Sequence, residues 1–400
     1  MKKWLSVAAI VVLCIALVIG VACSGDEEEE ESGAKKLKFG IGLPLSGIYG
    51  AYAGIPAKQG LELANKYIGE FTVAGERYKW DLIFEDSGLT GAGGVASTNK
   101  FVYDHDVDFM FQSTADPGFA AITITEELGM ILDIAAGSPF NYGPDMPHTF
   151  QTLNSWHLGT APFFDWLTKE HPEVKRVATS LIEGQLGAAL LDAIEGSCDY
   201  YGLELDATTH PMASREYYPI ATGIMSYHPD LVIGIAPLFE VLRELGYEGL
   251  CVCYHWTEGT WGNLPWDDAT GMLIFMPHPI GDLWPEVAAM AAEYEERYGA
   301  EFTSASLQTL TLLYVYTDIL KQAGTVDDID KIIETIETGT FATPVGPIHY
   351  GCEALNGIGH VGIWPAPIYE IVGESEYQVV EVYSPEEAEA LAEEVYAEGK

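Results

Sequence analysis

No residue pattern in the sequence is typical of catalysis. There is no Gly-x-Ser-x-Gly nucleophile turn, no His-Glu-x-x-His metal motif and no Gly-x-x-x-x-Gly-Lys phosphate loop. Gly40 and Gly42 stand in an expected strand, but the third glycine of a dinucleotide-binding turn is missing. The sequence therefore predicts a protein that is not an enzyme, and we expect no cofactor and no metal site.

The residues best suited to bind a small molecule follow expected apolar strands. Gln112, Ser113 and Thr114 come after a strand at 107–111 and before a helix that begins near Pro117. Hydroxyls and free backbone N–H groups at the start of a helix suit a carboxylate or another acceptor. Simple N-capping of the helix would use the same side chains.

The loop after the first expected strand offers a second candidate site. Ser46 and Tyr52 lie there, and both could contact a ligand. Alternatively, Ser46 and Gly47 only form the turn, and Tyr52 caps the helix that follows.

The elements that would position these residues alternate along the chain between apolar strands and helices of about 10 to 15 residues. The expected strands are 38–43, 80–84, 107–111, 130–134, 177–181, 231–235, 250–253 and 272–276. The expected helices are 57–67, 95–103, 118–128, 159–169, 187–201, 220–227, 238–245, 286–298, 306–323 and 326–338. This alternation predicts an α/β protein with two doubly wound lobes, mainly parallel sheets and a three-segment hinge.

The order of the elements indicates where the chain changes lobe. We expect the first lobe to contain residues 37–154 and 284–345, and the second lobe residues 155–283 and 346–383. Residues 384–400 are predicted to form an acidic helix that decorates the surface.

The N-terminal segment is typical of an exported protein. Residues 1–22 combine two lysines with a long apolar run, which predicts a signal peptide; an uncleaved membrane anchor is the alternative. Cys23 then stands where a lipid anchor would be attached, although Gly20 replaces the leucine usual before such a site. The acidic residues within 23–36 are expected to form a solvated tether rather than a site for metal or basic partners.

Charge and cysteine content restrict the partners. The formal net charge is −41, so nucleic acid and anionic lipid surfaces are excluded, because binding them requires clustered Lys and Arg. Outside the cytoplasm, one disulfide is expected among the four cysteines that follow Cys23, with its pairing open. They are Cys198, Cys251, Cys253 and Cys352.

Several motifs together resemble the leucine/isoleucine/valine-binding family of ABC-transporter solute-binding proteins, which have the type I periplasmic-binding fold. The segments that carry the resemblance are 39–47, 85–87, 96–103, 271–273 and 345–348, with Gly50, Gly54, Gly60 and Ala64 between the first two. It extends over roughly residues 37–380 in the family's order. The resemblance implies two lobes joined by three crossings, with the ligand between them.

The resemblance also implies further binding residues. Tyr52 occupies a place where family members often set an aromatic ring against the ligand. Ala136, Gly137 and Ser138 match the ligand-contacting turn after the fifth strand, where small residues allow close backbone approach.

Two departures from the family concern the second lobe. Leu186 stands where amino-acid binders often have Tyr, and Tyr254, His255 and Trp256 stand near their acidic ammonium ligand. A buried ammonium without a carboxylate is costly, which argues against an α-amino acid unless Glu258 supplies the carboxylate.

The departures favour a ligand with an apolar or aromatic body and at most one anionic end, such as an aliphatic or aromatic carboxylate or amide. Tyr52, Tyr254, Trp256 and Leu238 would then hold it. The other aromatic residues of this region, Trp261, Trp266 and Trp284, are expected to pack within a lobe, and His255 to be structural.

The resulting hypothesis is an extracytoplasmic, membrane-anchored receptor for a small organic solute, which delivers it to ABC permease subunits. We expect a monomer. A tethered sensor that passes the closed state to a membrane signalling partner is the alternative, and neighbouring permease or kinase genes would separate the two.

Overall fold

The computed structural model describes residues 33–211, 214, 216–254, 256, 264–279 and 283–397. The expected signal peptide, Cys23, His255, Glu258 and Trp261 lie outside these residues. Within them, no helix combines the length and apolar character needed to cross a membrane.

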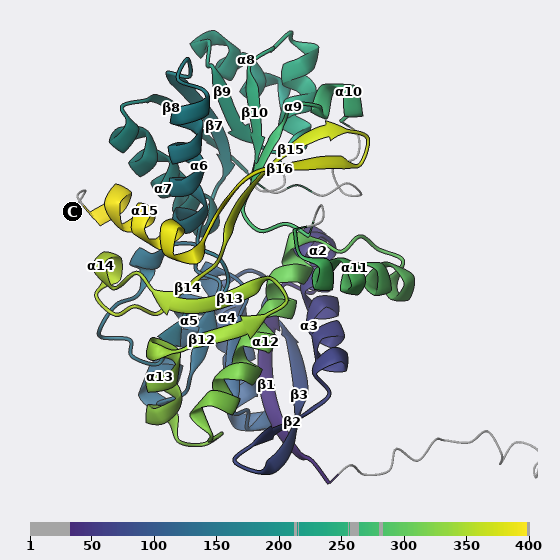
Figure 1. The fold of residues 1–400 in the computed structure, drawn as a ribbon, viewed down its shortest axis with the longest axis vertical. Coiled ribbons are helices and arrows are strands. Elements are labelled where there is room, and N and C mark those ends of the chain that lie inside the picture. The colour runs from purple at the N-terminus through teal and green to yellow at the C-terminus, as the bar shows by residue number, and fades with distance from the viewer. Residues whose placement is uncertain are drawn as a thin grey trace, which may run out of the picture. The chain divides into compact units, whose positions relative to one another are not determined.

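The first lobe is built on a six-stranded sheet with the order β2-β3-β1-β4-β5-β6 (Figure 1). Strands β1, β4, β5 and β6 pair in parallel, and β2 pairs antiparallel with β3. The strands are β1 (Lys35–Leu43), β2 (Glu70–Val73), β3 (Glu76–Asp86), β4 (Phe109–Gln112), β5 (Leu132–Ile134) and β6 (Thr149–Phe150).

Helices cover both faces of this sheet because neighbouring residues of its strands point in opposite directions. Phe109 and Phe111 pack in one apolar core, whereas Met110 belongs to another. The helices up to β6 are α2 (Gly47–Tyr49), the π-helix η1 (Gly50–Gly54), α3 (Ile55–Ile68), α4 (Gly91–Asn99), the π-helix η2 (Lys100–His105), α5 (Ala115–Leu128) and the 3-10 helix η3 (Pro139–Asn141).

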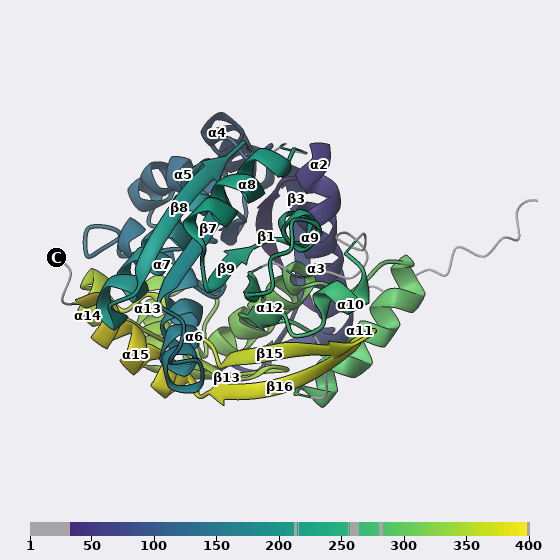
Figure 2. The same ribbon diagram turned by 90° about the horizontal axis from the view of Figure 1, so that it is seen from above.

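The second lobe is built on a seven-stranded sheet with the order β16-β15-β11-β10-β9-β7-β8. Its parallel part runs from β8 to β11, and β15 and β16 add antiparallel strands, which Figure 2 shows as a long ribbon. The strands are β7 (Arg176–Ile182), β8 (Glu204–His210), β9 (Leu231–Gly234), β10 (Leu250–Cys253), β11 (Leu273–Phe275), β15 (Ala366–Gly373) and β16 (Glu376–Tyr383).

This sheet is also covered on both faces. Cys251 and Cys253 face one core, and Val252 faces the other. The helices between β6 and β11 are α6 (Trp156–Glu170), α7 (Gln185–Tyr201), α8 (Tyr218–Tyr227), α9 (Ala236–Glu244) and α10 (Trp266–Ala269). The prediction of two doubly wound lobes with mainly parallel sheets is confirmed.

The chain returns to the first lobe after β11, through helices that pack in the core of the six-stranded sheet. These are α11 (Pro285–Tyr298), α12 (Ser304–Ala323) and α13 (Ile329–Thr338). A three-stranded antiparallel sheet follows, made of β12 (Thr340–Thr343), β13 (Gly346–Gly351) and β14 (Val361–Ile363), with α14 (Glu353–Asn356) in the loop.

The third crossing between lobes therefore differs from the predicted position at 345–346. Ile348, Tyr350 and Trp364 are buried in the core of the first lobe, because β13 pairs with β12 and β14. The chain enters the seven-stranded sheet only at Ala366.

The C-terminal helix α15 (Pro385–Ala397) is more than a surface decoration. It contacts α6 and α7 of the second lobe as well as β13 and β14 of the first. Tyr396 is buried and its hydroxyl donates to the carbonyl of Ala193 at 3.1 Å. Glu389 accepts from the backbone N–H of Cys352 at 2.7 Å. This helix therefore connects the two lobes.

The expected disulfide is absent from the described residues. Cys198, Cys251, Cys253 and Cys352 are all free thiols, and all are buried. Burial raises the pKa of both Cys198 and Cys251 to about 12, so these thiols stay protonated and contribute to apolar packing.

Candidate functional site

A cavity of about 680 Å³ has walls from both lobes. Its lining comes from segments at the carboxyl ends of strands, where open parallel sheets bind ligands. The first lobe contributes residues after β1, β4 and β5, and the second lobe contributes residues after β7, β8, β9 and β10. Of the predicted binding residues, six line this cavity: Tyr52, Ser113, Thr114, Gly137, Leu186 and Tyr254.

Two hydroxyls on the first-lobe wall have no partner among the described residues. Ser113 Oγ and Thr114 Oγ1 are both buried, yet neither makes a hydrogen bond there. Thr114 is the N-cap residue of α5, but its side chain makes no capping bond. The geometry thus leaves both hydroxyls available to a ligand, next to the positive end of a 14-residue helix.

Gly137 allows the backbone to approach the opposite wall. Its φ is +76°, and a Cβ there would meet the Trp156 ring at 3.0 Å. The Gly137 carbonyl accepts from the backbone N–H of Trp156 at 3.0 Å, which fixes the start of α6. Trp156 in turn packs edge-to-face against Tyr254, with ring centroids 5.9 Å apart.

Five tyrosines among the described residues line the cavity. We call four of them the tyrosine cluster: Tyr49, Tyr52, Tyr217 and Tyr254. The fifth, Tyr218, is exposed, and its hydroxyl donates to Glu244. Burial, together with smaller contributions from the nearby phenols of Tyr217 and Tyr52, raises the pKa of Tyr49 to about 12. Burial also raises the pKa of Tyr254, with added contributions from Tyr49 and Tyr217. The four phenols therefore lie near one another, and raised pKa values keep those of Tyr49, Tyr217 and Tyr254 protonated at neutral pH.

Sequence reasoning missed several residues of the wall. Tyr49 is only three residues from the expected turn at Ser46, so its loop had been found. His210 and Tyr217 lie at and beyond the end of β8, a strand that the pattern of apolar residues did not predict. His210 is buried, its Nδ1 lies 3.0 Å from Ser180 Oγ, and burial lowers its pKa, although Glu183 opposes this effect. A neutral imidazole therefore reaches the cavity.

Three of the predicted residues that lie outside the lining instead stabilise the first lobe. Gln112 is buried and its Nε2 donates to Ser97 and Thr98 of α4 at 3.0 and 3.1 Å. Ser46 forms a hydrogen bond to Asp86, which makes the turn after β1. Ser138 accepts from the backbone N–H of Phe140 at 3.3 Å and so starts η3.

The other three take part in apolar packing. Ala136 and Leu238 are fully buried in the cores of the first and second lobes. Trp256 is buried, donates its indole N–H to the Tyr377 hydroxyl at 2.9 Å and packs edge-on against Trp266. Trp284 packs against the core of the first lobe. Neither Trp266 nor Trp284 lines the cavity.

Away from the cavity, a set of buried residues that hydrogen-bond to one another connects two of the segments that cross between the lobes. We call this set the hinge cluster: Asp133, Thr152, Tyr316, Tyr350 and Trp364. Asp133 accepts from the backbone N–H and the hydroxyl of Thr152, and from the Tyr316 hydroxyl at 3.3 Å. The Thr152 hydroxyl also contacts the Tyr350 hydroxyl. The backbone carbonyl of Thr152 accepts from Trp364 Nε1 at 2.7 Å.

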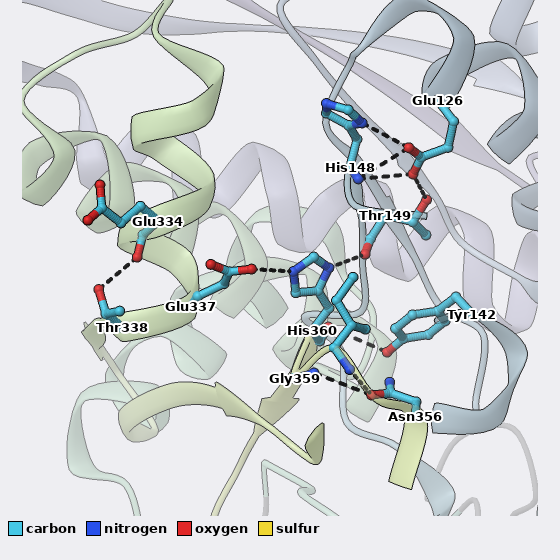
Figure 3. Close-up of polar contacts among 11 residues, drawn as sticks. Glu126, Tyr142, His148, Thr149, Glu334, Glu337, Thr338, Asn356, Gly359 and His360 are labelled. Atoms are coloured by element: carbon cyan, nitrogen blue, oxygen red, sulfur yellow. Dashed lines mark hydrogen bonds and ion pairs between the residues drawn. The ribbon is translucent and has the colours of Figure 1, made fainter. Parts of the chain in front are cut away.

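Figure 3 shows a second polar network, which includes Glu126, Thr149, Glu337 and His360. His360 is buried, with its Nδ1 2.9 Å from the carbonyl of Thr149 and its Nε2 3.1 Å from Glu337. Glu126 accepts from the Thr149 hydroxyl at 2.7 Å and from the His148 backbone N–H at 3.0 Å. These contacts connect β6 to the residue that precedes β14. Within the described residues, no group of His, Cys, Asp and Glu is arranged to hold a metal ion.

Comparison with known proteins shows which protein family this chain belongs to. The family model described as "Periplasmic binding protein" matches residues 36–372. The chain therefore belongs to the periplasmic binding protein family, and it is a solute-binding protein rather than an enzyme. No match was found among curated protein sequences.

Solved structures with this fold are similar over most of the chain. A leucine-binding protein of Thermotoga maritima has 18% identity and a TM-score of 0.69, covering 88% of this chain and 99% of its own. A solute-binding protein of an R. palustris ABC transporter, in complex with benzoate, has 17% identity and a TM-score of 0.73, covering 88% and 97%. A second R. palustris protein, in complex with 4-hydroxybenzoate, has 15% identity and a TM-score of 0.73, covering 88% and 97%. These likenesses show the type I periplasmic-binding fold.

Proposed function

We propose that this protein is the extracytoplasmic receptor of an ABC-type uptake system, which closes its two lobes on a small organic solute without transforming it. The observation that carries the proposal is the cavity of about 680 Å³, to which both lobes contribute walls. A volume of this size suits a solute of metabolite size. Solved relatives named as ABC-transporter binding proteins support the same role.

The wall chemistry supports a solute with an apolar or aromatic body and one acceptor end, such as a carboxylate or an amide. Tyr52 of the first lobe and Leu186 and Tyr254 of the second would contact the body. The Ser113 and Thr114 hydroxyls would donate to the acceptor end, because they have no partner among the described residues. An aromatic carboxylate in one solved relative and the leucine named for another are consistent with such a division.

Ligand binding would then be coupled to closure. A solute that contacts residues of both lobes stabilises the closed form by its extra contacts there. The closed form would dock onto membrane permease subunits, and ATP hydrolysis by other subunits would drive release. A lipid on Cys23 would hold the receptor at the membrane, with residues 23–36 as a tether.

The proposal is tested on the segment from Leu37 to Lys400 by a thermal-shift screen, followed by X-ray scattering. A solute that binds only the folded form adds about 2.7 kcal/mol of stability at a hundredfold excess over its Kd. We expect at least one solute to raise Tm and to reduce the radius of gyration.

The matched variants are Tyr52→Ala on the cavity wall and Tyr103→Ala, whose side chain is 71% exposed on η2. Tyr52→Ala should reduce affinity at least tenfold, and Tyr103→Ala should leave it unchanged. Failure of every amino acid, carboxylate, amide and amine to bind, with one scattering curve throughout, would overturn the proposal.

A further inference from the structure

Among the described residues, the charged side chains that line the cavity all have the same sign. Five carboxylates line it, and within the described residues the lining contains no Lys and no Arg. None of the five forms an ion pair with a described Lys, Arg or His, although Glu244 accepts from the Tyr218 hydroxyl. The carboxylates are Asp116, Glu183, Glu216, Glu240 and Glu244. Their summed field attracts cations into the cavity and opposes anions.

The carboxylates and the tyrosine cluster occupy different depths. Four carboxylates are exposed and Glu240 is half-buried, so they form a rim. The side chains of Tyr49, Tyr52, Tyr217 and Tyr254 are all half-buried. Aromatic ring faces and phenol oxygens both carry partial negative charge. The inner part of the cavity is thus aromatic and electron-rich, whereas full negative charges stand at its entrance.

This arrangement favours one kind of positive charge over another. A primary ammonium that leaves water needs hydrogen-bond acceptors for its three N–H groups. An N-alkylated ammonium has few or no such donors, and aromatic faces stabilise it by cation–π attraction. The rim carboxylates then contribute attraction at a distance without direct contact.

We propose that the ligand of this cavity is an organic cation whose charge lies on an N-alkylated ammonium group held by the tyrosine cluster. The inference rests on the proposed receptor function and adds the charge of the solute. The acceptor end expected at Ser113 and Thr114 is compatible with it, because a betaine-like solute carries both groups.

The test is a matched set of probes measured by calorimetry at low and high salt. Benzyltrimethylammonium, benzylamine, benzyl alcohol and benzoate share one ring and differ in charge and alkylation. Choline and 3,3-dimethylbutan-1-ol share one shape and differ only in charge. We expect binding of benzyltrimethylammonium and choline, at least tenfold weaker binding of benzylamine and of both alcohols, no binding of benzoate, and weaker cation binding at high salt.

Substitutions test which residues of the cavity are responsible for cation binding. Tyr49→Leu and Tyr217→Leu should each weaken benzyltrimethylammonium about tenfold. Glu183→Gln combined with Glu240→Gln should weaken it severalfold and reduce its salt dependence. The control Glu334→Gln removes an exposed carboxylate from α13, outside the cavity lining, and should change neither.

The two proposals fail in different ways. Binding of benzoate or of the alcohols as tight as that of the cations overturns the charge assignment and leaves the receptor function standing. Tighter binding of benzylamine than of benzyltrimethylammonium overturns the assignment to an alkylated ammonium. If neither these probes nor the wider solute screen bind, the receptor function fails and the inference falls with it.

Discussion

At the cavity wall, the hydroxyls of Ser113 and Thr114 are buried without a partner among the described residues. In the hinge cluster, by contrast, the hydroxyls of Thr152 and Tyr316 and the carboxylate of Asp133 all take part in hydrogen bonds. The polar atoms of both regions are buried, so burial alone does not distinguish them.

The difference separates polar groups that stabilise the fold from those that are available to a solute. A buried polar group without a partner costs about 1–3 kcal/mol, and a ligand that supplies the partner recovers this free energy. A group whose partners lie within the chain gains nothing from a ligand. The comparison therefore predicts that changes in the hinge cluster affect stability, whereas changes at the wall affect affinity.

The largest effect is expected at α15, whose buried polar contacts resemble those of the hinge cluster. Tyr396 is packed against α7, and its hydroxyl bonds Ser197 at 2.8 Å and the carbonyl of Ala193. Tyr396→Ala should lower the free energy of unfolding by about 5 kcal/mol, because it leaves a large cavity and removes the partner of the buried Ser197 hydroxyl. Urea denaturation measures this change, and Tyr103→Ala, at an exposed position, should stay within about 0.5 kcal/mol. A small effect of Tyr396→Ala would mean that α15 is not part of the folded core.

The next effect concerns pH. Burial raises the pKa of Asp133 from 3.8 to about 7, although bonds from Thr152 and Tyr316 oppose the rise. Tyr316 and Tyr350 stay protonated, because burial raises their pKa values well above 10. Between about pH 4 and pH 7 the unfolded chain ionises Asp133 while the folded chain does not. Folding stability is therefore lost as pH rises through this window, by on the order of 4 kcal/mol.

Asp133→Asn isolates this contribution, since an amide cannot ionise. The difference in unfolding free energy between this variant and the wild type should shift in favour of the variant as pH rises from 4 to 7, and then level off. Urea denaturation at several pH values measures it, and Asp81→Asn, at a more exposed carboxylate paired with Lys36, is the control. A difference that is constant with pH would show that Asp133 is ionised throughout.

The amino-acid sequence predicted most of the fold because its strands are apolar runs buried on both faces. Residues 231–235 and 250–253, for example, were expected as strands and form β9 and β10. The strand β8 escaped prediction, because it lies at the edge of its sheet and most of its side chains are only partly buried. The third crossing was misplaced because the pairing of β13 with β12 and β14 is a tertiary contact.

The candidate site was predictable only in part, for a related reason. Strand ends locate the wall, so Ser113 and Thr114 could be expected there. Which side of a helix faces the cavity depends on packing, and Leu238 at the start of α9 turned into the core instead. The tyrosine cluster draws residues from three separate segments of two lobes, which follow β1, β8 and β10, and no local pattern indicates that Tyr49 and Tyr217 lie near each other.

A pair of identical substitutions sharpens the comparison further. Thr152→Val removes a hydroxyl that bonds Asp133 and Tyr350, and it leaves both without that partner in a buried site. Asp133 keeps its bonds from the Thr152 backbone N–H and the Tyr316 hydroxyl, so we expect the free energy of unfolding to fall by about 2–3 kcal/mol, with little effect on solute affinity. Chemical denaturation together with calorimetry measures both quantities, and an unchanged stability would show that Thr152 is replaceable in the hinge cluster.

Thr114→Val makes the same chemical change at the cavity wall, where the hydroxyl has no partner among the described residues. Stability should change by less than about 1 kcal/mol, and in the direction of a more stable protein, because an unpaired buried hydroxyl is replaced by a methyl group. Affinity for a solute with an acceptor end should fall about tenfold, since the solute then loses its donor. If Thr114→Val instead destabilised the protein as much as Thr152→Val, both hydroxyls would serve the fold, and the distinction between wall and hinge would not hold.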